Sequence, residues 1–218
     1  MANLINSSYF EKGALYIPNN KDLNAALPGN PSNQTDLDFY IEEYERELLI
    51  NAFGIVLYDE YVVALQNLNQ ADQKWTDLID GKTYVNTSSV TKRWEGLRGA
   101  NKQSLVACYI YTQYLRNYNE TFATTGVVRN DSKNATNYDA TPKYIKAYNK
   151  FLEQYQSDLS SNPRIYVNKF GSEGIDWYGS EKATVSLHQF LTDSNELDAT
   201  SFPDFTFKFY AEQNSFGI

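Results

Sequence analysis

The sequence contains a single histidine and a single cysteine among its 218 residues, and this scarcity limits the chemistry that it can support. One residue of each kind cannot build a His/Cys zinc site, an iron–sulfur cluster or an internal disulfide. Cys108 lies in the apolar run 105–111, which favours a small core residue over a nucleophile. His188, between Leu187 and Gln189, is interpreted as structural, so we expect no thiol or metal chemistry.

Basic residues are also few, with 19 Lys and Arg against 27 Asp and Glu and a formal net charge of -8. A broad duplex-DNA-binding face is not expected, because phosphate neutralisation needs clustered Lys and Arg. No apolar run approaches the roughly 20 residues that cross a bilayer, and the N-terminus lacks the pattern of a secretion signal. Glycine-rich phosphate-binding motifs and the G-x-S-x-G nucleophile motif do not occur, so the sequence predicts neither an enzyme nor a cofactor.

Aromatic residues are abundant, at 15%, and hydrophobic residues make up 42%, which is enough for a packed core. A helix is predicted to begin at Thr35 or Asp36, because apolar residues follow at helical spacing: Leu37, Ile41, Tyr44, Leu48 and Ala52. Further helices are predicted at about 55–66, 72–79 and 104–118, and from 141 onwards with the stripe Tyr144, Tyr148, Phe151, Leu152 and Tyr155. Short strands or extended connectors are predicted at 82–86 and 93–97.

The flanking segments have a different character. Residues 1–34 are rich in turn residues and predict an arm that docks elsewhere, and 120–140 predicts a long polar loop. Residues 203–210 alternate strictly and predict a strand with Phe205, Phe207 and Phe209 on one face. The predicted fold is therefore mainly α: a small bundle of about four to five helices at 35–157, an N-terminal arm at 1–34, and a C-terminal extension with short β-strands at 158–218.

Two groups of charged residues are candidate functional sites. The acidic stretch 36–47 is the best candidate for catalytic carboxylates or a divalent metal, but the run is interpreted as a solvated helix face, since no histidine accompanies it. Lys143, Lys146 and Lys150 share one face opposite the aromatic stripe, and they too are interpreted as solvated.

Several phrases resemble the head–tail connector (adaptor, or neck ring) proteins of tailed bacteriophages, in the versions found in crAss-like phages and Bacteroides prophages. The resemblance covers about residues 35–218 and is carried by 39–49 (FYIEEYERELL), 53–58 (FGIVLY), 75–84 (WTDLIDGKTY), 94–97 (WEGL), 104–111, Thr125-Gly126, 187–191 (LHQFL) and 214–218 (NSFGI). None of these phrases has catalytic specificity.

The resemblance implies a structural virion protein at the neck or portal vertex, made in the bacterial host cytoplasm. It would assemble as an oligomeric ring, usually a dodecamer, between the portal protein and adjacent neck or tail rings. It would extend the DNA channel for genome ejection and dock tail components, and its acidic lumen would repel DNA without sequence-specific binding. The expected interface residues are Tyr9, Phe10, Tyr16, Ile17, Val127, Val128, Trp177, Tyr178, Phe205, Phe207, Phe209 and Phe216.

Two other functions remain open at this point. The first is a tail-associated or adaptor binding protein whose Tyr-rich surface recognises a protein or a glycan, because Tyr and Trp supply rigid contact area. The second is a metal-dependent hydrolase that uses the acidic helix. The surplus of Tyr and Phe beyond the needs of one small bundle favours a protein that binds partners.

Overall fold

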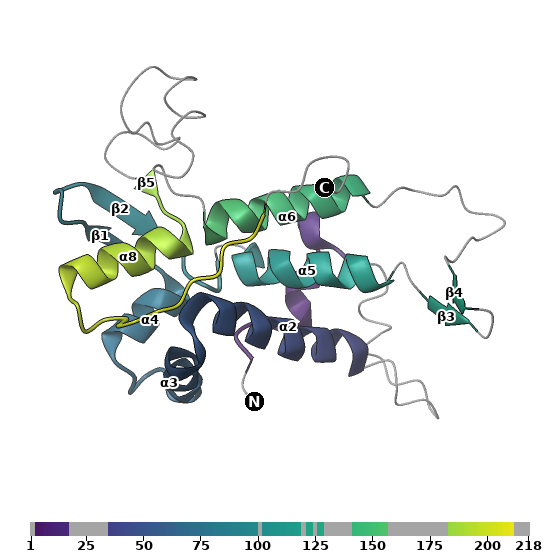
Figure 1. The fold of residues 1–218 in the computed structure, drawn as a ribbon, viewed down its shortest axis with the longest axis horizontal. Coiled ribbons are helices and arrows are strands. Elements are labelled where there is room, and N and C mark those ends of the chain that lie inside the picture. Colours follow the sequence, from purple (N-terminus) through teal and green to yellow (C-terminus); the bar gives the residue numbers. More distant parts are fainter. Residues whose placement is uncertain are drawn as a thin grey trace, which may run out of the picture.

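The computed structural model describes residues 3–17, 35–99, 102–118, 121–123, 126–128, 141–156 and 183–211. In these residues the fold is mainly α with short strands, as the sequence predicts. Its centre is a layer of three helices, α2 (Thr35–Phe53), α5 (Leu105–Tyr118) and α6 (Thr141–Tyr155), with α5 in the middle (Figure 1). α5 runs opposite to α2 and α6, so the two outer helices are parallel to each other.

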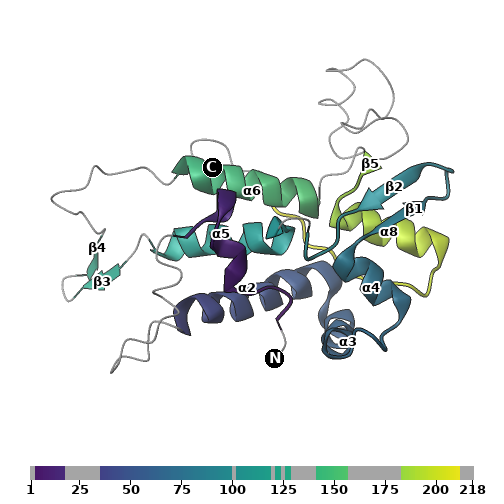
Figure 2. The ribbon, with the colours of Figure 1, turned by 180° about the vertical axis from the view of Figure 1, so that it is seen from behind.

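The first half of helix α5 is buried on every side. All its residues from Leu105 to Tyr111 are buried. The short 3-10 helices η1 (Ser7–Phe10) and η2 (Gly13–Leu15) cross one side of the layer (Figure 2), and the segment 203–211 crosses the other side from the end of α2 to α6 (Figure 1). Residues near both ends of the described chain therefore cover the two sides of the three-helix layer.

A second group of elements packs at the end of the layer where α2 finishes (Figure 1). It comprises α3 (Ile55–Gln66), α4 (Gln73–Asp80), β1 (Lys82–Val85), β2 (Thr91–Trp94), β5 (Ala183–Thr184) and α8 (Leu187–Leu197). β1 pairs with β2 antiparallel, with Tyr84 opposite Lys92, and β5 pairs with β2 in parallel. The side chains of α8 and of Phe202 join the same hydrophobic core as the layer, across the predicted boundary at 157/158.

Two glycines allow the turn after α4 to lie directly on the turn after β2. Gly81 and Gly96 both have a positive φ, of 93° and 82°. A Cβ on Gly81 would lie 2.6 Å from the carbonyl oxygen of Trp94, and one on Gly96 would lie 2.6 Å from the backbone nitrogen of Gly81. Larger residues would separate these two backbone segments.

The predicted helices are confirmed, and three other expectations need correction. The expected loop 120–140 contains a hairpin of β3 (Thr121–Ala123) and β4 (Gly126–Val128). Residues 203–210 form no strand, because their backbone contacts the end of a helix: Lys208 N donates to Asn51 O at 2.9 Å. The last carbonyls of a helix lack intrahelical donors, so an extended segment can pair with them without forming a sheet.

The third correction concerns the N-terminal arm. Residues 3–17 do not extend away from the body; they lie on α2 and α5 of the same chain. Their apolar side chains, Leu4, Ile5, Phe10, Leu15 and Ile17, are all buried in the core. The remainder of the predicted arm, residues 18–34, lies outside the described residues.

Candidate interaction surfaces

The expected interface residues of the N-terminal segment divide between core and surface. Phe10 and Ile17, expected to contact partners, are 0% and 1% exposed, because they cover the three-helix layer. Tyr9 is half-buried and donates its hydroxyl to the carbonyl oxygen of Arg98 at 3.2 Å. Tyr16 is exposed. Of these four side chains, only that of Tyr16 is placed for a contact with another molecule.

Glu45 fastens the N-terminal segment to α2. Its carboxylate accepts the backbone N–H of Leu4 at 2.8 Å and that of Ile5 at 3.4 Å. The side chain is buried, and this desolvation raises its pKa to about 7 although the two N–H groups act in the opposite direction. In the sequence, Glu45 belongs to the acidic stretch 36–47, which predicts a solvated face, so its burial corrects that expectation. The available signal was its position, four residues after Ile41 and three before Leu48, within the apolar stripe.

The C-terminal phenylalanines share one face, as predicted, and this face packs on the protein itself. The ring centroids of Phe205, Phe207 and Phe209 lie 6.3, 4.8 and 5.0 Å from that of His188 on α8. Phe207 also stacks on Tyr155 of α6 at 4.4 Å. Phe205 and Phe207 are half-buried, and Phe209 is 57% exposed. Phe209 is therefore the member of this group that is open to a partner.

The structure does not test the other expected interface residues. Val127 and Val128 belong to β4, whose backbone pairs with β3. Trp177, Tyr178 and Phe216 lie outside the described residues.

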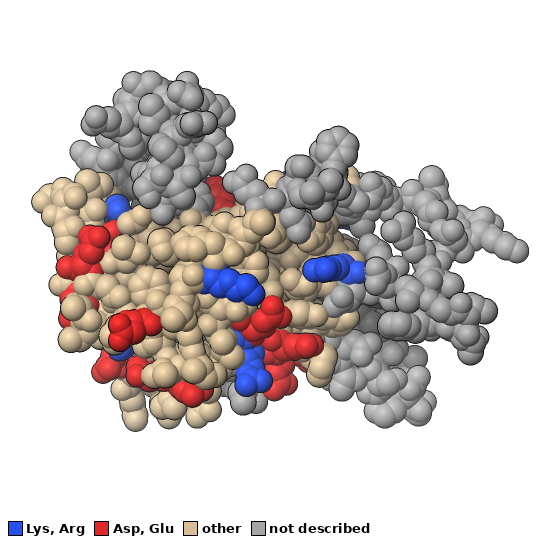
Figure 3. Space-filling model, in the orientation of Figure 1, with Lys and Arg blue, Asp and Glu red and all other residues tan. Residues whose placement is uncertain are grey.

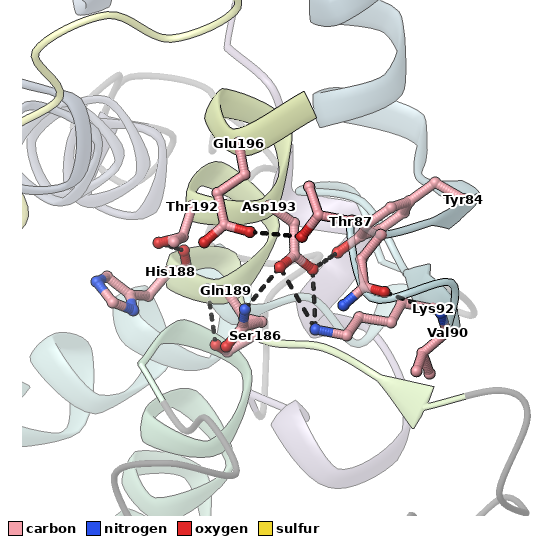
Figure 4. A network of polar contacts seen from close by, with 11 residues as sticks. Tyr84, Thr87, Val90, Lys92, Ser186, His188, Gln189, Thr192, Asp193 and Glu196 are labelled. Carbon is pink, nitrogen blue, oxygen red and sulfur yellow. Dashed lines mark hydrogen bonds and ion pairs between the residues drawn. The ribbon is translucent and has the colours of Figure 1, made fainter. Parts of the chain in front are cut away.

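A buried polar network joins α8 to the β1–β2 hairpin (Figure 4). Asp193, which is 2% exposed, accepts from the Tyr84 hydroxyl at 2.6 Å, from Lys92 Nζ at 3.1 Å and from Gln189 Nε2 at 2.8 Å. Burial, followed by the hydrogen bond to Asp193 and its charge, raises the pKa of Tyr84. The carboxylate is saturated by donors from its own chain, so this network stabilises the fold and offers no free group to a ligand.

An open hollow of about 500 Å³ lies beside this hairpin, lined by residues 80–83, 93–95, 98 and 99. Its three cations are each paired with a carboxylate: Lys82 with Asp77 at 2.6 Å, Arg93 with Glu95 at 2.9 Å and Arg98 with Asp80 at 2.8 Å. Because these charges are already compensated, the hollow has no excess of positive charge for an anion.

The acidic helix does not gather its carboxylates around one point. Glu42, Glu43 and Glu47 are exposed on α2 whereas Glu45 is buried. Within the described residues, no group of three or more His, Cys, Asp or Glu side chains could hold a metal ion. The same residues include no helix that is long and apolar enough to span a membrane.

Among the described residues, three helices expose apolar or charged side chains on their outer sides. α3 exposes Ile55, Val56 and Val63, at 53%, 70% and 66%, beside Asp59 and Glu60. α2 exposes Phe39 at 62% together with Glu42, Glu43 and Arg46. α6 exposes Lys143, Lys146 and Lys150. In the view of Figure 3, acidic side chains gather along the lower part of the molecule, over α2 and α3.

Comparisons with known proteins give no assignment. No protein-family model matches the chain, and no significant match was found among curated proteins or solved structures.

Proposed function

We propose that this protein is a structural virion subunit that forms an oligomeric ring between the portal and the tail of a bacteriophage. In this proposal the ring extends the DNA channel and provides a platform for tail components. The family resemblance of the sequence phrases suggests this place in the virion. The observation that supports a role in assembly is the exposed apolar row on α3.

The apolar row consists of Ile55, Val56 and Val63. Val56 and Val63 lie two turns apart on one side of α3, and Ile55 precedes them at the start of the helix. All three side chains are more than half exposed, although the opposite side of the same helix is buried through Leu57, Tyr58 and Tyr61. Exposed Asp59 and Glu60 lie between Val56 and Val63, so this side of α3 combines apolar and acidic residues, a mixture that is common in protein–protein interfaces.

The alternative of a Tyr-rich binding surface has less support. Most tyrosines whose burial the structure describes lie in the core or are half-buried, and Tyr16 is the exposed one among them. They pack in an aromatic chain around α5 and α6, for example Tyr109 with Phe151 at 5.0 Å and Phe151 with Tyr155 at 5.0 Å. These side chains stabilise the fold and are unavailable to a glycan or protein.

The net charge of -8 is compatible with a subunit that surrounds passing DNA, because like charges prevent the nucleic acid from adhering to the channel wall. The proposal requires acidic side chains on the inner wall of the assembled ring. A basic inner wall in a reconstruction of the neck would contradict this reading of the charge.

The test is assembly with the portal protein of the same virus. The purified chain, alone and mixed with portal, is analysed by size-exclusion chromatography with light scattering and by negative-stain microscopy. We expect rings or co-elution with portal, and we expect the double variant Val56→Asp/Val63→Asp to lose them. Val85→Asp is the control, because Val85 is also an exposed valine, at 54%, and lies on β1 away from α3. A chain that stays monomeric at every concentration, with and without portal, would refute the proposal.

A further inference from the structure

The two outer helices of the central layer have exposed faces of opposite charge. The α2 face contains Glu42 and Glu43, with Arg46 one turn further on, and the α6 face contains Lys146 and Lys150 followed by Glu153. α5 separates α2 from α6, so the two faces lie on opposite sides of the molecule and cannot meet within one copy (Figures 1 and 2). Each face could meet its complement only on a second molecule.

The residues on the two faces follow the same spacing. On α2, Phe39, Glu43 and Arg46 are separated by four and then three residues, and on α6 the same steps separate Lys146, Lys150 and Glu153. These steps keep each set on one side of its helix. α2 and α6 are also parallel within the molecule, so a neighbour in the same orientation would place its α2 parallel to this α6.

In that arrangement each residue of one set meets a complementary residue of the other. Glu43 lies opposite Lys150 and Arg46 opposite Glu153, and both are pairs of unlike charge. Phe39, which is 62% exposed, lies opposite Lys146, whose methylene stem can cover the ring while the ammonium group contacts its face.

We propose that the acidic face of α2 on one copy binds the basic face of α6 on the next copy, head to tail. Two different surfaces take part, so the contact is heterologous and repeats from copy to copy. A rotation about an axis parallel to these helices closes the repeat into a ring when a whole number of equal steps completes one turn without translation. The inference rests on the proposed ring for its closure, but the pairing of α2 with α6 can be tested without it.

The ion pair within α6 does not prevent this contact. Lys150 Nζ lies 3.2 Å from a Glu153 carboxylate oxygen, and both side chains are about half exposed. An exposed pair of this kind contributes little, so exchanging its partners costs little. Phe39 supplies the apolar contact, and the charges select the partner and the register.

The first experiment reverses charges on one face at a time. Glu43→Lys and Lys150→Glu each place like charges opposite each other, and we expect each to weaken self-association by about tenfold or more. The double variant Glu43→Lys/Lys150→Glu restores a pair of unlike charge and should recover most of the association. Glu196→Lys on α8 makes the same change in net charge as Glu43→Lys, lies outside both faces and outside α3, and should associate like the original chain.

The second experiment traps the contact directly. Cys108 is buried, and burial raises its pKa to about 12, so introduced cysteines would be the reactive ones among the described residues. A chain carrying Glu43→Cys and Lys150→Cys should give a ladder of covalent oligomers with a short bismaleimide. A mixture of chains that carry one substitution each should stop at the heterodimer, because each chain then has one reactive face.

The possible outcomes separate the two proposals. A ladder without closed rings supports the α2–α6 contact and counts against the ring. Rings that form normally in both charge-reversal variants, with no ladder, overturn the α2–α6 contact and leave the ring to other surfaces. Homodimers that are cross-linked within each single-cysteine chain would show a two-fold contact and would also overturn the inference.

Discussion

Replacing Glu45 with glutamine should remove a specific dependence of folding stability on pH. The Glu45 carboxyl is buried beneath the N-terminal segment, and its pKa is raised from an ordinary value near 4.5 to about 7. One pKa unit corresponds to about 1.4 kcal/mol of differential stability, so the shift corresponds to about 3 kcal/mol. Glutamine has nearly the same shape and can accept one of the two backbone N–H groups, but it does not ionise.

The direction of the effect follows from the order of ionisation. Below about pH 4.5 the carboxyl is protonated in both the folded and the unfolded chain, and it imposes no ionisation cost. As the pH rises through 7, the unfolded chain releases its proton first, so the folded state loses about 3 kcal/mol of relative stability. The phenols of Tyr9, Tyr58 and Tyr61 lie in the same region, and their pKa values are raised above 10, so they stay neutral in this range.

The assay is urea unfolding of the original chain and of Glu45→Gln at a series of pH values from 5 to 8. The quantity of interest is the difference between their free energies of unfolding. That difference should move in favour of the glutamine variant by about 2.5 kcal/mol between pH 5 and pH 8, because a smaller part of the effect has already developed at pH 5. Every other titratable group is present in both chains, so its contribution cancels in the difference. A difference that does not change with pH would refute the role assigned to Glu45.

Four further predictions concern stability. Phe207→Ala should lower the free energy of unfolding by about 2 kcal/mol, because the Phe207 ring is packed on Tyr155. Phe209→Ala should have little effect, because the Phe209 ring is mostly exposed, and urea unfolding measures both changes. Asp193→Ala should cost about 3 kcal/mol in the same assay, because it leaves three donors without their shared acceptor; a variant as stable as the original would contradict the network. Gly96→Ala should cost more than about 1 kcal/mol, which a drop in thermal midpoint would reveal, since its φ is 82° and a Cβ would strike backbone atoms. Deleting residues 1–17 should lower the thermal midpoint followed by circular dichroism, and an unchanged midpoint would show that this segment is not part of the core.

The helices could be predicted because each has a continuous apolar stripe at helical spacing. Residues 35–53 and 141–155 are the clearest cases, and the structure has a glycine directly after two of the helices, Gly54 after α2 and Gly81 after α4. Such signals are local, since the residues that make the pattern are also the residues that form the helix.

The contacts that close the fold join residues distant in sequence, and local patterns do not reveal them. The alternation at 205–209 correctly placed three phenylalanines on one face, but it could not show that their backbone would meet the end of α2 and not another strand. Glu45 was assigned to the surface by its charged neighbours, although its donors, Leu4 and Ile5, lie forty residues away or more. Propensity indicates a conformation, and only tertiary structure selects the partner.

The position of the aromatic residues changes where partners should be sought. The surplus of Tyr and Phe in the sequence predicts a surface that contacts partners. In the described residues, however, most of these rings surround α5 and α6. The segments 3–17 and 203–211 cover the two sides of the three-helix layer, so neither side is open to a second molecule without displacing part of the fold. Among the described residues, the outer surfaces of α2, α3 and α6 stay open, and on each of them exposed apolar or basic residues lie beside charges of the other sign or beside apolar groups. An assembly built on these faces would depend on ionic strength, because its specificity would come from charge pairing and only a small part of its stability from buried apolar area.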